Sequence, residues 1–357
     1  MQNRYLSCTL LLLALWSISV DAFLSSSTRP SLPPGLLRAH VSSVELTPEV
    51  RVSSIGIGCW AWGDSSFWGY NSSQDAQLLE TYKVCVENGV NFFDTAEIYG
   101  FGKSELLLGR FERLTGSKVQ VATKFAPLPL PGRFSSDAVV EACLNSLDRL
   151  GTSRMALYQL HWPVLLQNDR FLDGLARCYE KGLCSGVGVS NYGASQLKYA
   201  HKKLAAKGIP LVTNQIQYSL LARAPESNGL LRTAKELNVK VLAYSPLAQG
   251  VLCGKFSDDK LPSGPRGFLV KRTLPKVRSL LEEMRAIAER ENKTMSQVAL
   301  NWCLQQGVVP IPGARSVSQA LDNCGAMGWD LSESDVTRLN DLSRDSGVDL
   351  TTPLQGR

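Results

Sequence analysis

The sequence predicts an α/β fold, a single (β/α)8 TIM barrel that ends in extra C-terminal helices. Eight short apolar runs follow one another after Val44, and each is bounded by Gly, Pro or polar residues, as strands buried on both faces are. Longer stretches with helical spacing of apolar residues lie between these runs. Eight strands that alternate with helices favour one parallel barrel over two domains. The length of 357 residues fits, because such barrels run to roughly 250 residues or more.

The elements can be placed in chain order. The expected strands span residues 55–59, 90–93, 119–123, 155–160, 185–189, 211–216, 239–243 and 308–311. Residues 249–273 are rich in Gly, Pro, Lys and Arg without a periodic face, which predicts a long functional loop after strand seven. Helices are then expected over residues 274–291, 294–306, 316–327 and 332–343. Ser332, with Asp335 three residues on, is typical of a helix start.

Composition and charge indicate a globular domain that acts on small molecules. Hydrophobic residues make up 44% and charged residues 20%, and the net charge is +6. Because Lys and Arg are scattered along the chain, we expect no nucleic-acid partner. The charge suits an anionic small ligand.

The N-terminus has the composition of a targeting segment. Arg4 precedes an apolar stretch from Leu10 to Val20, which is long enough for a signal peptide and too short to span a membrane. Residues 23–44 are basic, Ser-rich and free of acidic residues, as transit peptides are. We therefore expect a signal peptide over 1–22, a transit-peptide-like segment over 23–44 and the barrel over 45–357. This order resembles the presequences that target proteins to secondary chloroplasts, so a plastid is expected; plain secretion is the alternative.

The cysteines predict neither a metal site nor a disulfide framework. Eight of the nine lie after residue 44, an even number that would also allow disulfides. Most of them, however, sit inside apolar periodic segments, where Cys behaves as a small buried hydrophobe. No CxxC or Cys/His metal spacing occurs. Reduced thiols are expected, and no metal.

Four ionisable residues follow consecutive predicted strands: Asp94, Tyr99, Lys124 and His161. In a barrel, the carboxyl ends of the strands carry the active site. Together the four make a proton-delivery device: a lysine beside a tyrosine lowers the tyrosine pKa, a carboxylate fixes the lysine, and a histidine orients the substrate oxygen. Each has a simpler explanation alone, as a helix cap, a loop anchor, a solvated strand end or a core histidine.

These residues, in the motif Asp94-Thr95-Ala96-x-x-Tyr99-Gly100 with Lys124 and His161, resemble the catalytic tetrad of the aldo-keto reductases. The resemblance runs from Ile55 to about Leu342. It implies that NADPH reduces an aldehyde or ketone to the alcohol, with Tyr99 as general acid. No GxGxxG follows a strand, which excludes a Rossmann domain. The stretches 254–256 and 262–267 resemble the plastid-type plant members.

The same resemblance implies which residues bind the cofactor. Ser190, Asn191 and Gln215 would hold the nicotinamide carboxamide, and Tyr244 would stack on its ring. The following loop would hold the pyrophosphate: Ser245, Pro246, Leu247, Gln249 and Gly250. The 2′-phosphate would lie at the turn and helix that contain Gly313, Arg315, Gln319 and Asn323, and an arginine at a helix N-terminus is an anion site in its own right.

Three tryptophans are candidates for the substrate pocket. Trp60 and Trp62 follow the first strand and Trp162 follows His161, so all three are placed to form an apolar slot for a carbonyl substrate. Either of the first two could instead pack beneath the loop. A second hypothesis of a different class is a cofactor-binding sensor subunit with little turnover, since ion-channel β-subunits resemble this family. Slow turnover and a co-purifying membrane partner would distinguish it.

Overall fold

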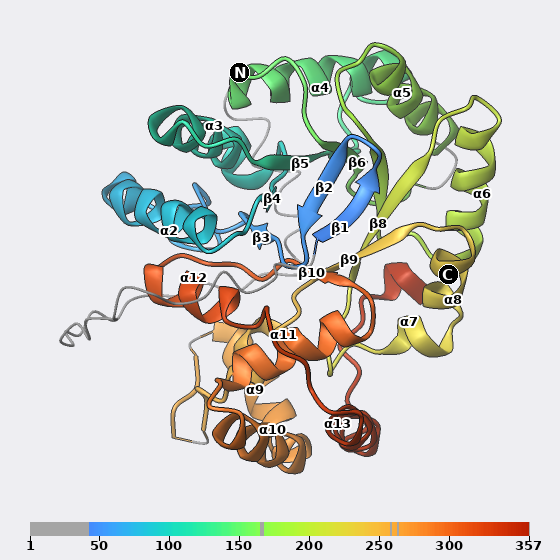
Figure 1. The fold of residues 1–357 in the computed structure, drawn as a ribbon. Helices are drawn as coiled ribbons and strands as arrows, with labels where there is room; N and C mark the ends of the chain where they lie inside the picture. The colour runs from blue at the N-terminus through green and yellow to red at the C-terminus, as the bar shows by residue number, and fades with distance from the viewer. Residues whose placement is uncertain (1–42, 165–167, 258, 263, 357) are drawn as a thin grey trace.

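The computed structural model describes residues 43–164, 168–257, 259–262 and 264–356. Eight parallel strands lie at the centre of the molecule and helices surround them (Figure 1). In chain order the strands are β3 (Ile57–Gly58), β4 (Phe92–Asp94), β5 (Gln120–Phe125), β6 (Leu157–Leu160), β7 (Val187–Ser190), β8 (Leu211–Gln217), β9 (Lys240–Tyr244) and β10 (Val309–Pro310). Each strand pairs with the next along the chain. The predicted fold class and all eight predicted strands are therefore confirmed.

The first and last strands close the barrel. Gly56 N donates to Pro310 O and Gly58 N donates to Pro312 O, both at 3.0 Å, and Gly58 forms a parallel bridge with Gly313. A Cβ atom on Gly58 would lie 2.9 Å from Ile311 O, so the close approach at this seam requires glycine. The seam brings the loop after β3 next to the turn after β10.

Helices alternate with the strands and cover the outside of the barrel (Figure 1). They are α2 (Asp75–Glu87), α3 (Lys103–Thr115), α4 (Ser136–Leu150), α5 (Asn168–Glu180), α6 (Ala194–Ala205), α7 (Ala224–Ser227), α8 (Leu230–Glu236), α9 (Gly264–Thr273), α10 (Arg278–Arg290), α11 (Met295–Gln305), α12 (Val317–Cys324) and α13 (Glu333–Asp345). Short 3-10 turns occur at η2 (Ser72–Gln74), η3 (Tyr99–Gly102), η4 (Ala248–Cys253), η5 (Leu274–Lys276) and η6 (Pro353–Gly356). The Ser332 hydroxyl accepts from Asp335 N at 3.1 Å, which confirms the predicted start of α13.

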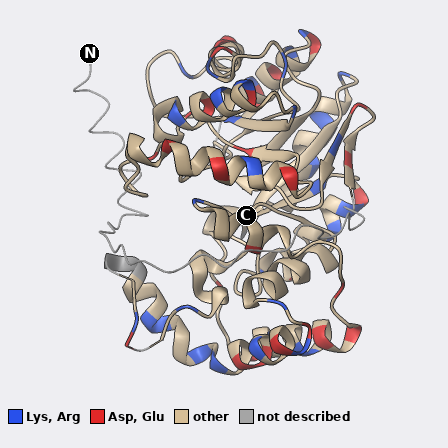
Figure 2. Ribbon diagram, turned by 60° about the vertical axis from the view of Figure 1, so that its left-hand side comes forward, with Lys and Arg blue, Asp and Glu red and all other residues tan. Residues whose placement is uncertain are grey.

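The helices pack on the barrel through apolar faces. In α4, for example, Val139, Cys143 and Leu147 are buried in the largest core cluster. Burial of each aliphatic side chain contributes about 1.5–3 kcal/mol to folding. On the outer faces, Lys and Arg are interspersed with Asp and Glu (Figure 2).

A β-hairpin that the sequence patterns did not predict covers one end of the barrel. Strand β1 (Ser43–Thr47) pairs antiparallel with β2 (Val50–Ser53), and the hairpin lies across the barrel end in Figure 1. Leu46, Val50 and Val52 pack against residues at the amino ends of the barrel strands, among them Phe92 and Leu157. Because this end is sealed, only the carboxyl ends of the strands remain for a site.

The predicted loop after the seventh strand is partly helical. Residues 249–273 contain most of η4 and all of α9. The expectation of a segment without regular structure is wrong for these parts. The sequence of α9 has no amphipathic face, since Val270 is buried while Phe268 is 69% exposed, and periodicity could not reveal the helix.

The N-terminal expectations fall largely outside the described residues. The signal peptide over 1–22 lies entirely outside them, as does the transit-like segment up to residue 42; Ser43 and Val44 belong to β1. Within the described ranges, no helix is both long and apolar enough to cross a membrane. The eight cysteines of these ranges are free thiols, and all but Cys253 are buried.

Candidate active site

A buried ion pair lies at the centre of the barrel near the carboxyl ends of the strands. Lys124 Nζ donates to Asp94 Oδ1 at 2.5 Å and to the main-chain oxygen of Thr95 at 2.8 Å. The Lys124 side chain is completely buried and that of Asp94 is 3% exposed. Burial lowers the pKa of Lys124, and the Asp94 carboxylate opposes this shift. The pairing between Asp94 and Lys124 that the sequence suggested is therefore present.

Two glutamines complete the surroundings of the Asp94 carboxylate. Its Oδ2 atom accepts from Gln215 Nε2 at 2.8 Å and from Gln159 Nε2 at 3.3 Å. Gln159 was not among the predicted site residues. It lies on β6 inside an otherwise apolar run, two residues before His161, and its side chain reaches Asp94 on the inner face of the barrel. A polar residue at that position was the signal that could have found it.

Tyr99 lies above the ion pair in a tight turn, η3. The turn needs glycine next to the tyrosine: Gly100 has a φ of 54°, and a Cβ there would lie 2.2 Å from Gly63 O. Lys124 Nζ is 5.1 Å from the centroid of the Tyr99 ring, and the ring of His161 is 5.7 Å away, edge-on. The turn thus brings the four predicted residues into one cluster.

The pKa of Tyr99 shifts in the direction opposite to the prediction. Burial raises it well above its ordinary value, and the Asp94 carboxylate raises it further. The net shift is upward because burial outweighs any opposing effect of the Lys124 ammonium, which is directed to Asp94 Oδ1 and Thr95 O. Tyr99 is consequently protonated throughout the neutral range.

A second salt bridge ties the segment just before the Tyr99 turn to the loop after β5. Glu97, two residues before Tyr99, accepts from Ala126 N at 2.6 Å and pairs with Arg133. Burial raises the pKa of Glu97, while Arg133 opposes the shift. Sequence reasoning missed Glu97 because no local pattern relates it to Arg133, 36 residues later.

His161 is neutral in this environment. Burial lowers its pKa well below the ordinary value, and the charge of Lys124 lowers it further. Its Nδ1 atom is buried and has no hydrogen-bond partner among the described residues. The ring packs against Trp162, with centroids 4.8 Å apart. A neutral imidazole can donate one N–H and accept at its other nitrogen.

The two tryptophans after β3 have different environments. The Trp60 ring lies 6.1 Å from Tyr99 and stacks on Phe67 at 4.9 Å, so Trp60 lines the strand ends. Trp62 is fully buried, donates from Nε1 to Ala314 O at 2.7 Å and packs in the core beside Phe111. The expectation that Trp62 walls the substrate pocket is therefore wrong, because its ring faces the core. For Trp60 and Trp162, a place in the wall of the substrate pocket remains a prediction.

The residues expected at the nicotinamide form one hydrogen-bond network. Asn191 Nδ2 donates to His161 O and to Ser190 Oγ, both at 3.1 Å, and Asn191 Oδ1 accepts from Tyr244 OH at 3.0 Å. Ser190 Oγ donates to Gln215 O at 2.9 Å. Asn191 has a φ of 62°, a left-handed conformation that asparagine tolerates better than most residues. The network joins β7, β8 and β9 at the mouth of the barrel.

The loop after β9 has an unusual backbone. Ser245, Ala248 and Gln249 have positive φ values of 51°, 46° and 55°, and Gly250 follows at 91°. Three of these residues, Ala248, Gln249 and Gly250, are consecutive and left-handed, which makes a tight turn, and turn backbones can present N–H groups to an anion. This loop contains all five residues expected at the pyrophosphate, namely Ser245, Pro246, Leu247, Gln249 and Gly250.

The turn after β10 leads into the N-terminus of α12. Arg315 N donates to Gln319 Oε1 at 2.8 Å, and the Arg315 guanidinium lies over the Trp68 ring, 5.2 Å from its centroid. Asn323 Nδ2 donates to Gly313 O at 3.3 Å. The four residues expected at the 2′-phosphate therefore lie in one turn and the helix α12 that follows it, and Trp68 is a neighbour that the sequence did not suggest.

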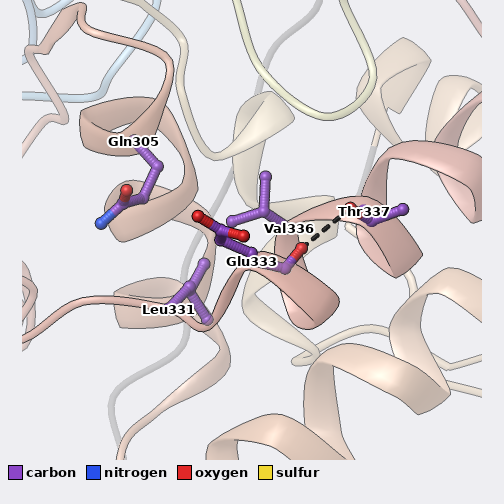
Figure 3. Close-up of a pocket in the computed structure, with 5 residues that line it drawn as sticks. All are labelled: Gln305, Leu331, Glu333, Val336 and Thr337. Atoms are coloured by element: carbon purple, nitrogen blue, oxygen red, sulfur yellow. Dashed lines mark hydrogen bonds between the residues drawn. The ribbon is translucent and has the colours of Figure 1, made fainter.

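A separate pocket lies away from this cluster (Figure 3). It has a volume of about 320 Å³ and is lined by Gln305, Leu331, Glu333, Val336 and Thr337. Gln305 ends α11 four residues before β10 begins, which places the pocket at the amino ends of the strands. None of the expected site residues lines it. Among the described residues, no group of three or more His, Cys, Asp or Glu is arranged to bind a metal.

Comparisons with known proteins identify the family of this chain. Residues 54–344 match the Aldo/keto reductase family. A chloroplastic pyridoxal reductase from Arabidopsis thaliana is 44% identical over 311 residues, 83% of this chain and 85% of the relative. Two solved structures are similar: a glycerol dehydrogenase from Gluconobacter oxydans (TM-score 0.74, 26% identity, 85% of this chain and 95% of that one) and an aldo-keto reductase from Klebsiella pneumoniae in complex with NADPH (TM-score 0.65, 25% identity, 82% and 92%).

The fold and these relatives define the chain as a TIM-barrel oxidoreductase. It belongs to the aldo/keto reductase family.

Proposed function

We propose that this protein reduces an aldehyde or ketone to the corresponding alcohol with NADPH, and that Tyr99 donates the proton. The observation that carries the proposal is the buried Lys124–Asp94 ion pair beneath the Tyr99 ring, with a neutral His161 packed edge-on against that ring. Burial of two charges costs several kcal/mol per ion, which favours a functional reason for the pair.

The described residues fit NADPH. Gln217 Oε1 and His161 Nδ1 are buried at or beside the strand ends without a partner among the described residues, so polar groups are ready for a ligand. Asn191 and Gln215 would hold the nicotinamide amide, and the positive-φ loop after β9 would hold the pyrophosphate. Arg315 at the start of α12 would bind the 2′-phosphate. When bound, NADPH supplies the hydride; the solved relative from Klebsiella pneumoniae is in complex with NADPH.

Tyr99 suits a proton donor because it is protonated at neutral pH. Its hydroxyl would donate to the carbonyl oxygen of the substrate and become a phenolate. The Lys124 ammonium, 5.1 Å from the ring centroid, would stabilise this negative charge, and the Asp94 carboxylate holds Lys124 in place. General acid catalysis of this kind contributes about 10²- to 10⁴-fold to a rate.

His161 would position the carbonyl oxygen. Because its pKa is low, the imidazole stays neutral and its N–H can form a hydrogen bond to that oxygen without competing for the proton of Tyr99. Trp60 and Trp162, whose rings lie near Tyr99 and His161, would give the slot apolar walls, which would favour an aldehyde with an apolar or aromatic body. Pyridoxal is the first such aldehyde to test, since a relative of this chain is named for it.

We further propose a plastid location and a catalytic barrel over 45–357 that follows a signal peptide and a transit-like segment. The composition of residues 1–44 supports this, as does the chloroplastic name of the relative from Arabidopsis thaliana.

The test is consumption of NADPH, and of NADH in parallel, with pyridoxal and with short and aromatic aldehydes. Tyr99→Phe removes one hydroxyl, and we expect it to lower turnover about 10²- to 10⁴-fold while NADPH binding remains. The control is Tyr158→Phe, a buried tyrosine of β6 whose hydroxyl donates to Val139 O. Unchanged turnover in Tyr99→Phe would rule out Tyr99 as the acid. Tight NADPH binding without turnover by the unmodified protein would favour a sensor subunit.

A further inference from the structure

A single carboxylate organises the loop between β3 and α2. Asp64 lies in this loop and is only 7% exposed, whereas most aspartates stay in water. Its Oδ1 atom accepts from Ser66 N and Phe67 N, both at 2.9 Å, and from Ser66 Oγ at 3.2 Å. An aspartate that binds the main-chain N–H groups two and three residues later closes a tight turn. The Oδ1 atom thus fixes the course of the loop.

The other oxygen of the same carboxylate reaches the Trp60 indole. Trp60 Nε1 donates to Asp64 Oδ2 at 3.1 Å, and this bond uses the one N–H that an indole has. The turn at Oδ1 also places Phe67 against the indole, with ring centroids 4.9 Å apart and planes 15° apart, a stacked arrangement that aromatic pairs favour. Asp64 therefore holds the Trp60 ring in two ways, directly and through Phe67.

The loop around Asp64 is packed against the turn that holds Tyr99. A Cβ atom on Gly100 would lie 2.2 Å from Gly63 O and 3.1 Å from Asp64 N, so the two main chains are in close contact. The ring centroids of Trp60 and Tyr99 are 6.1 Å apart, and the ring planes differ by 31°. Because Asp64 fixes the Trp60 ring next to this contact, it sets where the indole lies relative to the Tyr99 hydroxyl.

We propose that Asp64 is a positioning residue that determines substrate specificity, because it holds the Trp60 indole where flat aromatic aldehydes are preferred over short aliphatic ones. The ring of an aromatic aldehyde can pack against the indole while its carbonyl oxygen meets the Tyr99 hydroxyl, whereas a short aliphatic aldehyde has no ring to pack. This inference rests on the proposed function, since it takes Tyr99 as the proton donor and Trp60 as a wall of the slot.

The test measures selectivity, the ratio of kcat/KM for benzaldehyde to kcat/KM for propanal. Asp64→Asn keeps an oxygen for the N–H groups of the turn but sets an amide N–H against Trp60 Nε1, so that bond is lost. We expect the ratio to fall roughly 2- to 10-fold, the effect of one hydrogen bond, mainly through a higher KM for benzaldehyde. The dissociation constant of NADPH should not change. The control is Ser66→Ala, which removes one donor to Oδ1, keeps the Trp60 bond and should leave the ratio unchanged.

A second background isolates the hydrogen bond. Trp60→Phe removes the indole N–H and should by itself lower the same ratio. In this background Asp64→Asn should have no further effect on the ratio, because the bond is already absent. Trp60→Phe also keeps the inference testable if Asp64→Asn does not fold, since an unchanged ratio in Trp60→Phe would then overturn it.

Other outcomes would also overturn the inference. An unchanged ratio in Asp64→Asn would exclude the positioning role. An equal loss of kcat/KM for both aldehydes would show an effect on Tyr99 itself, whose pKa is raised by burial and also by the charge of Asp64. A loss of selectivity that persists in the Trp60→Phe background would show that the bond to Trp60 is not its cause. If the unmodified protein oxidised NADPH with no aldehyde, the proposed function would fail and this inference with it.

Discussion

Removal of the Lys124 charge should destabilise the protein strongly, even in the absence of any ligand. Lys124→Met keeps most of the side-chain volume but leaves the Asp94 carboxylate buried, with only Gln215 and Gln159 as side-chain donors. Loss of one partner of a buried pair costs about 3–5 kcal/mol, because an uncompensated charge stays in a medium of low polarity. We expect a decrease of that size in the free energy of unfolding.

The converse change and the double variant give the coupling energy. Asp94→Asn leaves the Lys124 ammonium buried without a carboxylate and should also cost about 3–5 kcal/mol. In the double variant neither charge remains, and replacement of a buried pair by neutral groups is often close to neutral. The double variant should therefore be more stable than either single variant, with a coupling energy of several kcal/mol.

Urea unfolding at pH 7, followed by tryptophan fluorescence, gives the free energy of unfolding of the unmodified protein, the two single variants and the double variant. Similar slopes against urea would show that the extent of unfolding is unchanged, so that midpoints can be compared. Additive costs, with the double variant the least stable, would refute the reasoning: the 2.5 Å contact between Lys124 and Asp94 would then contribute nothing specific.

Three further changes address single residues. Below about pH 6.5 the unfolded chain binds a proton at His161 that the native chain does not, so the free energy of unfolding should fall by up to ~1.4 kcal/mol per pH unit. His161→Gln should reduce this slope when unfolding is measured against pH. An unchanged slope would contradict the low pKa of His161. Trp62→Phe should lower the free energy of unfolding by about 1–3 kcal/mol and leave the KM for aldehydes unchanged. Trp60→Leu should raise that KM. The reverse pattern would show that Trp62, and not Trp60, contacts the substrate. Trp68→Leu removes the ring beneath the Arg315 guanidinium, a cation–π contact that contributes about 0.5–1 kcal/mol. In titrations this change should weaken the binding of NADPH but not of NADH. Tighter NADPH binding would mean that the Trp68 ring competes with the 2′-phosphate for Arg315.

The sequence alone was sufficient to predict the barrel and the cluster of Asp94, Tyr99, Lys124 and His161. Strands buried on both faces give continuous apolar runs, and no strand end differs from its predicted position by more than two residues. Asp94, Lys124 and His161 could be found because each follows or ends such a run, and a parallel barrel gathers these ends at one mouth.

Other features depend on distances that no local pattern contains. The direction of the Tyr99 pKa shift follows from burial and from where the Lys124 ammonium points. Trp60 and Trp62 are two residues apart in one loop, yet one faces the mouth and the other the core, because a loop lacks the alternation of a strand.

The hairpin at the opposite end of the barrel sets a limit on how far the N-terminus can be trimmed. Leu46, Val50 and Val52 are 8%, 2% and 0% exposed, and burial of each contributes about 1.5–3 kcal/mol. A protease that cut after Val52 would remove a sum comparable with the whole net stability of an ordinary domain, about 5–15 kcal/mol. Any maturation cleavage compatible with a stable barrel therefore leaves Leu46 in place, and recombinant forms should begin no later than Glu45.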